Sequence, residues 1–146
     1  MGIKFSSVTK EYILDLYNNS LISNSFWISN ELYIENTYLI ICDNMQVGLV
    51  QLHFGVFKNH RKYANVDMIE LFSSCKYRGL GKITVAEIFK AFKLSTLFGE
   101  ALASAIPFWY NIGANFEMNE NKLYNEYILN GYSACFKLTK RSFEKH

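Results

Sequence analysis

Seven residues near the middle of the chain combine glycine with positive charge in a pattern that suits phosphate binding. Segment 76–82 reads Lys-Tyr-Arg-Gly-Leu-Gly-Lys. Gly79 and Gly81 lack a Cβ atom, so the backbone can approach a ligand closely and adopt positive φ. If a helix begins here, its free N–H groups and the positive end of its dipole meet at one point. The loop therefore predicts a phosphate or pyrophosphate site, although two glycines before a helix also serve as a plain tight turn.

The segments that flank this loop predict the elements that position it. Residues 66–72 are mostly apolar and bounded by polar residues, as a short buried strand is. After the loop, Val85, Ile88, Phe89 and Phe92 recur at the i, i+3, i+4 and i+7 spacing of one helix face. We therefore expect a strand, a glycine turn and a helix in succession, with that helix face in a core.

A second segment, 105–114, reads Ala-Ile-Pro-Phe-Trp-Tyr-Asn-Ile-Gly-Ala. Together with segment 76–82 it resembles the two hallmarks of the GNAT-type N-acetyltransferases, a Gln/Arg-x-x-Gly-x-Gly/Ala loop and an Ala-x-x-Phe-Tyr-x-x-x-Gly-Phe segment. The gap between the two has room for one helix and one strand, which is also similar to the family. The resemblance covers residues 36–116 well and the two ends more loosely.

The resemblance implies an α/β class and a GNAT-like fold, formed as a single acyl-CoA-binding domain over residues 1–146. That fold has a mixed, mostly antiparallel twisted sheet of about six or seven strands, with the central strands splayed and about four flanking helices. In the family the loop holds the pyrophosphate of acetyl-CoA, the co-substrate, and the pantetheine arm pairs with exposed strand backbone. The implied cofactor-binding residues are Leu71, Phe72, Ser73, Lys76, Tyr77, Arg78, Gly79, Leu80, Gly81, Lys82 and Trp109.

Acetyl transfer to an amine needs a neutral amine, a polarised thioester carbonyl and a proton for the leaving thiolate. One backbone N–H of residues 71–73 would polarise the carbonyl. Glu70 is the first candidate base, because some family members place a carboxylate base just before the loop, and Glu100 on the neighbouring strand is the second. Each also fits the simpler role of a strand carboxylate that is solvated or paired with a cation.

The sequence departs from the family pattern at two binding positions. Lys76 stands where the family has Gln or Arg. A register that starts at Arg78 instead would place Ile83 at the last small position, so we prefer the first register. Leu102 stands where many members have Asn.

A third departure concerns the general acid. Trp109 stands where many members carry the Tyr that protonates the leaving thiolate, and an indole N–H has no such acid chemistry. Tyr110 is the candidate acid in its place, although on a helix it points about 100° away from Trp109. Tyr77, Tyr132 and proton transfer through water are alternatives.

Two classes of function follow from these residues. The first is an acetyl-CoA-dependent N-acetyltransferase that moves the acetyl group by direct attack in a ternary complex. Its amine acceptor is a small molecule, an aminoacyl group or a protein amine, and a homodimer is compatible with it. The second, which Trp109 keeps open, is a catalytically degenerate CoA-binding or protein-interaction module on the same fold. A plain α/β domain whose glycines only form a turn is a third interpretation.

Composition narrows the class of protein. The chain has 146 residues, of which 50% are hydrophobic and 16% aromatic, so one domain with a real core is expected. A net charge of +2 does not indicate nucleic acid as a partner. Three cysteines without metal-ligand spacing, no signal peptide and no membrane-length apolar run predict a soluble cytoplasmic protein without a metal site.

The remaining elements follow from local patterns. Residues 43–46 predict the turn of a β-hairpin, and Gly48 in its second strand predicts a bulge or a close backbone approach. Ser104 is the expected N-cap of a short helix that has Pro107 in its first turn. We expect strands at 3–5, 38–42, 47–54, 96–103, 132–138 and from Phe116. We expect a first helix capped by Ser6, Ser7 or Thr9, with Ile13, Leu16, Tyr17 and Leu21 on one face. Further helices are expected within 23–36, at 104–112 and, raggedly, within 117–130, and a cationic connection over 56–63.

Overall fold

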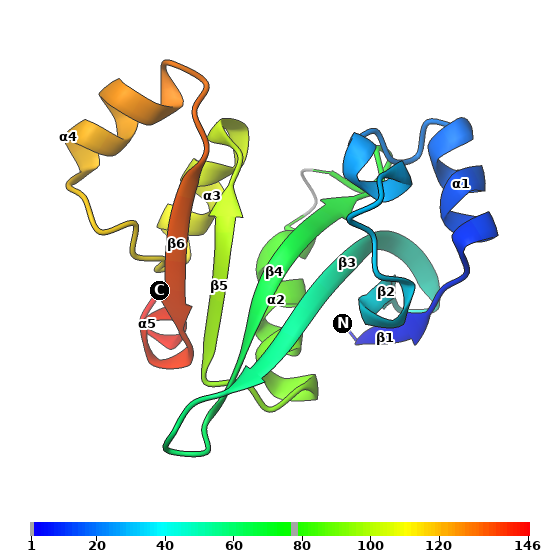
Figure 1. The fold of residues 1–146 in the computed structure, drawn as a ribbon, viewed down its shortest axis with the longest axis horizontal. Helices are drawn as coiled ribbons and strands as arrows, with labels where there is room; N and C mark the ends of the chain where they lie inside the picture. The colour runs from blue at the N-terminus through cyan, green and yellow to red at the C-terminus, as the bar shows by residue number, and fades with distance from the viewer. Residues whose placement is uncertain (1, 77–78) are drawn as a thin grey trace. The chain divides into compact units, whose positions relative to one another are not determined.

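A computed structural model describes residues 2–76 and 79–146 of the chain, so two predicted loop residues, Tyr77 and Arg78, lie outside the described residues. Six strands form one sheet in the order β1-β2-β3-β4-β5-β6 (Figure 1). The pairs β1–β2, β2–β3 and β5–β6 are antiparallel and β4–β5 is parallel, which confirms the mixed, mostly antiparallel sheet expected from the sequence. The strands are β1 Ile3–Ser7, β2 Thr37–Cys42, β3 Met45–Val56, β4 Lys62–Leu71, β5 Thr96–Ala101 and β6 Ala134–Thr139.

The chain divides into two compact units, and β3 and β4 run through both. The first unit comprises Met1–His53 and Asp67–Ala91. It holds helix α1 Lys10–Asn18, and the Oγ1 atom of Thr9 accepts the N–H of Tyr12 at 3.1 Å as its N-cap. Thr9 is therefore the correct one of the three predicted caps.

Residues 23–36 form two short 3-10 turns in the first unit, η1 Ser25–Ile28 and η2 Ile34–Asn36, where the sequence predicted one short helix and a loop. The side chain of Asn24 accepts the N–H of Phe26 at 2.9 Å and so caps η1. The N–H of Trp27 donates to the carbonyl of Asn24 at 3.2 Å, the i→i+3 bond of a 3-10 turn.

The hairpin of β2 and β3 forms as predicted. Asp43 and Asn44 at its turn have φ of 50° and 69°, as a two-residue turn matched to the twist of strands requires. The β2–β3 register shifts beside Gly48, and a Cβ atom on Gly48 would lie 2.6 Å from the carbonyl oxygen of Glu70 on β4. Both the bulge and the close approach expected at Gly48 are confirmed.

Helix α2 Leu80–Ala91 completes the first unit and packs against β1. It begins at Leu80, inside segment 76–82, so of the two loop glycines only Gly79 adopts the expected positive φ, whereas Gly81 and Lys82 lie in the first turn of the helix. Its buried residues are Leu80, Thr84, Val85, Ile88 and Phe89, which include three of the four expected core positions; the fourth, Phe92, lies just beyond its end.

The second unit comprises Phe54–Val66 and Phe92–His146. Its strands are β5 and β6 with the adjoining parts of β3 and β4, and the parallel β4–β5 register runs from Tyr63–Thr96 to Val66–Gly99. Its helical elements are η3 Ala103–Ala105, α3 Ile106–Asn111, α4 Glu120–Lys122, the π-helical turn η4 Leu123–Ile128, and α5 Lys140–Glu144.

Two sequence-based expectations in the second unit are wrong. Ala105, not Ser104, is the N-cap of α3, because the 3-10 turn η3 takes up Ser104; Pro107 does lie in the first turn of α3. Phe116 is buried but begins no strand, since the chain there makes only one bridge, between Asn115 and Lys137.

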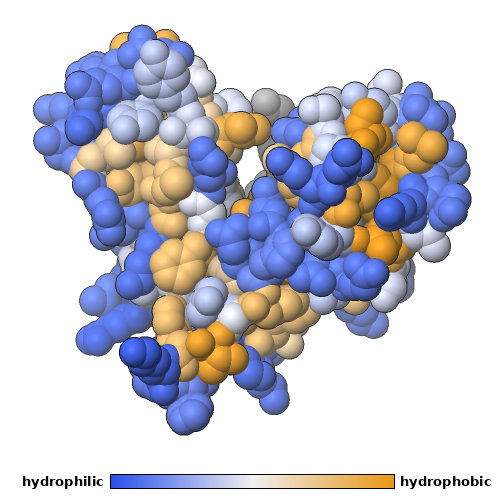
Figure 2. Space-filling view, in the orientation of Figure 1, coloured by the Kyte–Doolittle hydropathy of each residue, from blue (hydrophilic) through white to orange (hydrophobic). Residues whose placement is uncertain are grey.

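On the face drawn in Figure 2, apolar areas lie between polar and charged side chains. Among the described residues, no helix has both the length and the apolar character needed to cross a membrane. The exposed large apolar side chains include Leu14, Ile28, Tyr33 and Met45 in the first unit and Phe54, Val56, Leu102, Tyr124 and Leu129 in the second.

Candidate functional site

The glycine loop follows the end of β4 in the first unit. Gly79 has φ of 72°, and a Cβ atom there would meet nothing within 4 Å, so its backbone conformation and not lack of space is what favours glycine. Lys76 and Lys82 are exposed on either side of it. The predicted sequence of strand, glycine turn and helix N-terminus is therefore formed.

The backbone that leads into the loop is partly engaged within the first unit. The N–H of Phe72 donates to Val47 at 2.7 Å, and the N–H of Ser73 donates to Leu21 at 3.0 Å. Neither N–H is available to a thioester carbonyl in this structure. Because successive N–H groups of a strand point to opposite edges, the N–H of Leu71 points away from β3, toward which Phe72 donates.

Glu70, the predicted base, holds the loop that precedes η1. Its Oε2 atom accepts the N–H of Ser23 at 2.8 Å and the hydroxyl of Ser23 at 3.2 Å. Its Oε1 atom accepts the N–H of Asn24 at 3.1 Å and the indole N–H of Trp27 at 2.9 Å. A carboxylate has about four lone-pair positions, and these four donors fill them. The geometry gives Glu70 a structural task and leaves no lone pair for the proton of an amine.

The second candidate base, Glu100, lies on β5 in the other unit. Its side chain is exposed and accepts the hydroxyl of Ser133 at 2.7 Å. An exposed strand carboxylate of this kind is compatible with the solvated role, and the base role of Glu100 stays a prediction.

Trp109 and Tyr110 differ sharply in their surroundings within the second unit. Trp109 is 4% exposed, and its ring stacks on Phe136 with centroids 4.3 Å apart. This burial and the stacking on Phe136 fit a core role, and the predicted cofactor contact of Trp109 stays a prediction. Tyr110 is 39% exposed and keeps an accessible hydroxyl-bearing ring, as a candidate acid requires.

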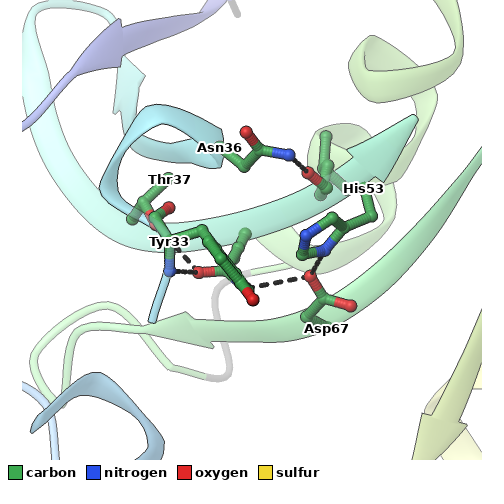
Figure 3. A network of polar contacts seen from close by, with 7 residues as sticks. Tyr33, Asn36, Thr37, His53 and Asp67 are labelled. Atoms are coloured by element: carbon green, nitrogen blue, oxygen red, sulfur yellow. Dashed lines mark hydrogen bonds and ion pairs between the residues drawn. The ribbon is translucent and has the colours of Figure 1, made fainter. Parts of the chain in front are cut away.

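A polar network that the sequence did not reveal joins β3 and β4 in the first unit (Figure 3). The Nδ1 atom of His53 pairs with Oδ2 of Asp67, and the same oxygen accepts the side-chain N–H of Gln51 at 2.9 Å. Gln51 is 1% exposed, and its own oxygen accepts the backbone N–H of Tyr33 at 2.7 Å. A backbone N–H can only donate, so this bond fixes which end of the Gln51 amide is the oxygen.

The network reaches the surface through its two rings. The side chain of His53 is 44% exposed, and that of Asp67 is 18% exposed. Tyr33, which is 55% exposed, stands nearly perpendicular to the imidazole, with ring centroids 5.2 Å apart and an interplanar angle of 88°. The network thus runs from the buried amide of Gln51 through the partly buried carboxylate of Asp67 to the accessible imidazole of His53.

Sequence reasoning missed this network because neither His53 nor Asp67 stands in a recognisable motif. The available signal was the pairing of two predicted strands. His53 and Asp67 already fall on the strands predicted at 47–54 and 66–72, which are neighbours in the sheet.

The cationic connection over 56–63 lines a separate cavity in the second unit, with a volume of about 540 Å³. The residues that line the cavity are Phe57, Lys58, Asn59, Arg61, Ser95, Thr96, Lys137 and Thr139.

Among the described residues, no group of three or more His, Cys, Asp and Glu side chains could hold a metal ion.

Solved structures resemble this chain over nearly its whole length. Arabidopsis thaliana Naa50 in complex with a bisubstrate analogue of CoA and an acetylated peptide matches with a TM-score of 0.63 and 12% identity, covering 95% of this chain and 99% of that one. The spermidine/spermine N-acetyltransferase SpeG from Vibrio cholerae matches with a TM-score of 0.59 and 14% identity, covering 99% and 98%. The Bacillus subtilis N-acetyltransferase YlbP in complex with coenzyme A matches with a TM-score of 0.59 and 11% identity, covering 96% and 97%.

No family model and no curated relative matches the sequence. At identities this low the structural likeness establishes the fold and nothing beyond it. The strand order and the near-complete coverage agree with the architecture that the two sequence motifs implied. The chain has the fold of the GNAT acetyltransferases.

Proposed function

We propose that the protein is an N-acetyltransferase that moves an acetyl group from acetyl-CoA to an amine. The observation that carries the proposal is the glycine loop in its structural context, between the end of β4 and the N-terminus of the twelve-residue helix α2. A helix N-terminus after a glycine turn suits a pyrophosphate, and Lys76 and Lys82 add positive charge beside it. The solved structures that share this fold include N-acetyltransferases in complex with coenzyme A or its analogues.

The cofactor would be held mainly by backbone groups. In this assignment segment 76–82 takes the pyrophosphate, and the end of β4 pairs with the pantetheine amides. The N–H of Leu71 polarises the acetyl carbonyl, because the N–H groups of Phe72 and Ser73 donate elsewhere. The proposed role of Tyr110 is to return a proton to the thiolate.

The acceptor is a primary amine of a small molecule, an aminoacyl group or a protein. Among the structures with this fold, SpeG is a polyamine acetyltransferase and the Naa50 complex holds an analogue of an acetylated peptide. Spermidine and the peptide Met-Val-Asn-Ala-Leu are therefore suitable first probes for this chain.

Calorimetric titration with acetyl-CoA tests the proposal, with CoA and ATP as controls. Micromolar binding of acetyl-CoA and CoA, without binding of ATP, is the expected result. A thiol-release assay with the two probe amines then measures transfer. Absence of acetyl-CoA binding would overturn the proposal and favour a protein-interaction module. Binding without transfer to any amine would favour the degenerate CoA-binding module.

A further inference from the structure

We infer that His53 is the general base that takes the proton from the acceptor amine, and that Asp67 positions its ring. This inference rests on the proposed function, because it assigns one step of that reaction. It replaces Glu70, whose carboxylate already accepts four hydrogen bonds from Ser23, Asn24 and Trp27.

The hydrogen bonds of the network determine which nitrogen of His53 carries the hydrogen. The oxygen of Gln51 is fixed by the N–H of Tyr33, so its NH₂ end donates to Oδ2 of Asp67. An ionised carboxylate oxygen that accepts from Gln51 also accepts from Nδ1 of His53. Neutral His53 therefore has its hydrogen on Nδ1, which leaves the lone pair on Nε2.

The basic nitrogen is accessible. Within residues 2–76 and 79–146, Nε2 of His53 has no hydrogen-bond partner, and the side chain is 44% exposed. The edge-to-face contact with Tyr33 and the bond to Asp67 hold the imidazole from two sides (Figure 3). A carboxylate that orients an imidazole and stabilises its protonated form is the arrangement that makes histidine an effective base.

The proton balance of the step is complete. The acceptor arrives as R–NH₃⁺, and Nε2 takes one proton, giving R–NH₂ and an imidazolium that the Asp67 carboxylate stabilises. The amine lone pair forms the C–N bond as the C–S bond of the thioester breaks. The nitrogen loses a second proton, which passes to the thiolate. The products are the amide, CoA as its thiol, and one proton that His53 returns to solvent.

The first test compares His53→Asn with His60→Asn. Asparagine at position 53 places its amide N–H where Nδ1 was, so the bond to Asp67 is kept while the base is removed. We expect kcat with the probe amine to fall by about 100-fold or more, with the Kd of acetyl-CoA unchanged. His60 is exposed with φ of 67° in the hairpin of the second unit, a conformation that asparagine tolerates, so His60→Asn should keep full activity.

Two further readouts separate a base from a structural residue. Exogenous imidazole should restore part of the lost kcat to His53→Ala, because the base is then supplied from solution. Asp67→Asn removes the charge that stabilises the imidazolium and should lower kcat while the KM for acetyl-CoA stays constant. Rescue by imidazole is not expected from a loss of stability alone, and urea denaturation of Asp67→Asn checks that its lower kcat does not come from a smaller folded fraction.

The tautomer is measured by ¹⁵N NMR of the histidine side chains in the wild type and needs no acceptor. Hydrogen on Nδ1 of neutral His53 supports the inference, and hydrogen on Nε2 overturns it. In a wild type that acetylates a probe amine, a fully active His53→Asn variant also overturns it. Failure of the wild type to bind acetyl-CoA would overturn the proposed function instead, and the base assignment with it.

Discussion

The indole N–H of Trp27 donates a 2.9 Å hydrogen bond to the carboxylate of Glu70, which lies 43 residues further along the chain. Trp27 is 1% exposed, so its N–H needs a partner inside the protein. The same carboxylate accepts two backbone N–H groups, from Ser23 and Asn24. One side chain of β4 thus fixes the segment that leads into η1.

Glu70→Gln should lower the free energy of unfolding by about 2 kcal/mol, the typical cost of losing hydrogen bonds to a charged group. In glutamine one of the two carboxylate oxygens is replaced by an NH₂ group, which cannot accept a hydrogen bond. Either the N–H of Ser23 or that of Trp27 therefore loses its acceptor. Urea denaturation measures the change. Glu100→Gln, at an exposed position of β5, is the matched control and should change stability by less than about 0.5 kcal/mol. Unchanged stability together with reduced turnover would return Glu70 to the role of base.

Gly48→Ala should destabilise the first unit, because the new methyl group would lie 2.6 Å from the carbonyl oxygen of Glu70 and 3.0 Å from Cα of Leu71. Both contacts are with backbone, so β3 and β4 must separate to accommodate it, at a cost of about 1–3 kcal/mol. Gly2→Ala is the control, since its methyl group would meet nothing closer than 3.9 Å. Thermal denaturation compares the two, and equal melting temperatures would contradict the close approach.

Gly81→Glu should abolish acetyl-CoA binding and leave the far-UV circular dichroism unchanged. It adds both a side chain and a negative charge in the first turn of α2, where the pyrophosphate is proposed to bind. Ala91→Glu places the same group at the exposed C-terminal end of this helix and should bind acetyl-CoA normally. Calorimetry provides the comparison, and unaltered affinity in Gly81→Glu would remove the pyrophosphate assignment.

Trp109→Phe should reduce stability without weakening acetyl-CoA binding. A phenyl ring keeps part of the stacking on Phe136, so the loss should stay below the roughly 3–5 kcal/mol that complete truncation of a buried tryptophan costs. Denaturation and calorimetry on the same sample separate the two properties. A weakened acetyl-CoA affinity at unchanged stability would instead support a direct cofactor contact by Trp109.

Tyr110→Phe should slow acetyl transfer by about 100-fold if this tyrosine protonates the thiolate, the lower end of what a general acid contributes. The ring is retained, so the stability of α3 should not change. Tyr124→Phe removes the hydroxyl of another exposed tyrosine of the same unit and serves as the control. Full activity of Tyr110→Phe would clear Tyr110 of the acid role and favour proton transfer through water.

The sequence predicted the elements whose signals are local. The helix after the glycine loop follows from apolar residues at 3.6-residue spacing, and three of them, Val85, Ile88 and Phe89, are buried in α2. The β2–β3 hairpin follows from two runs of β-formers around a turn whose residues adopt positive φ. Ser104 and Phe116 were misassigned because their fates depend on neighbours: a 3-10 turn takes up the first, and only one bridge forms beside the second.

By itself, the sequence determined the strand–turn–helix unit with its glycines, because backbone conformation and periodicity are properties of adjacent residues. Only the tertiary structure decided the partners of the polar side chains. Glu70 meets donors more than 40 residues away, and His53 meets Asp67 across two strands whose register no local pattern specifies. The same holds for Trp109, whose contact with Phe136 depends on how α3 packs on β6. The roles of the Glu70 carboxylate and the His53 imidazole depend on the donors and acceptors around them, and folding brings those groups from distant parts of the chain.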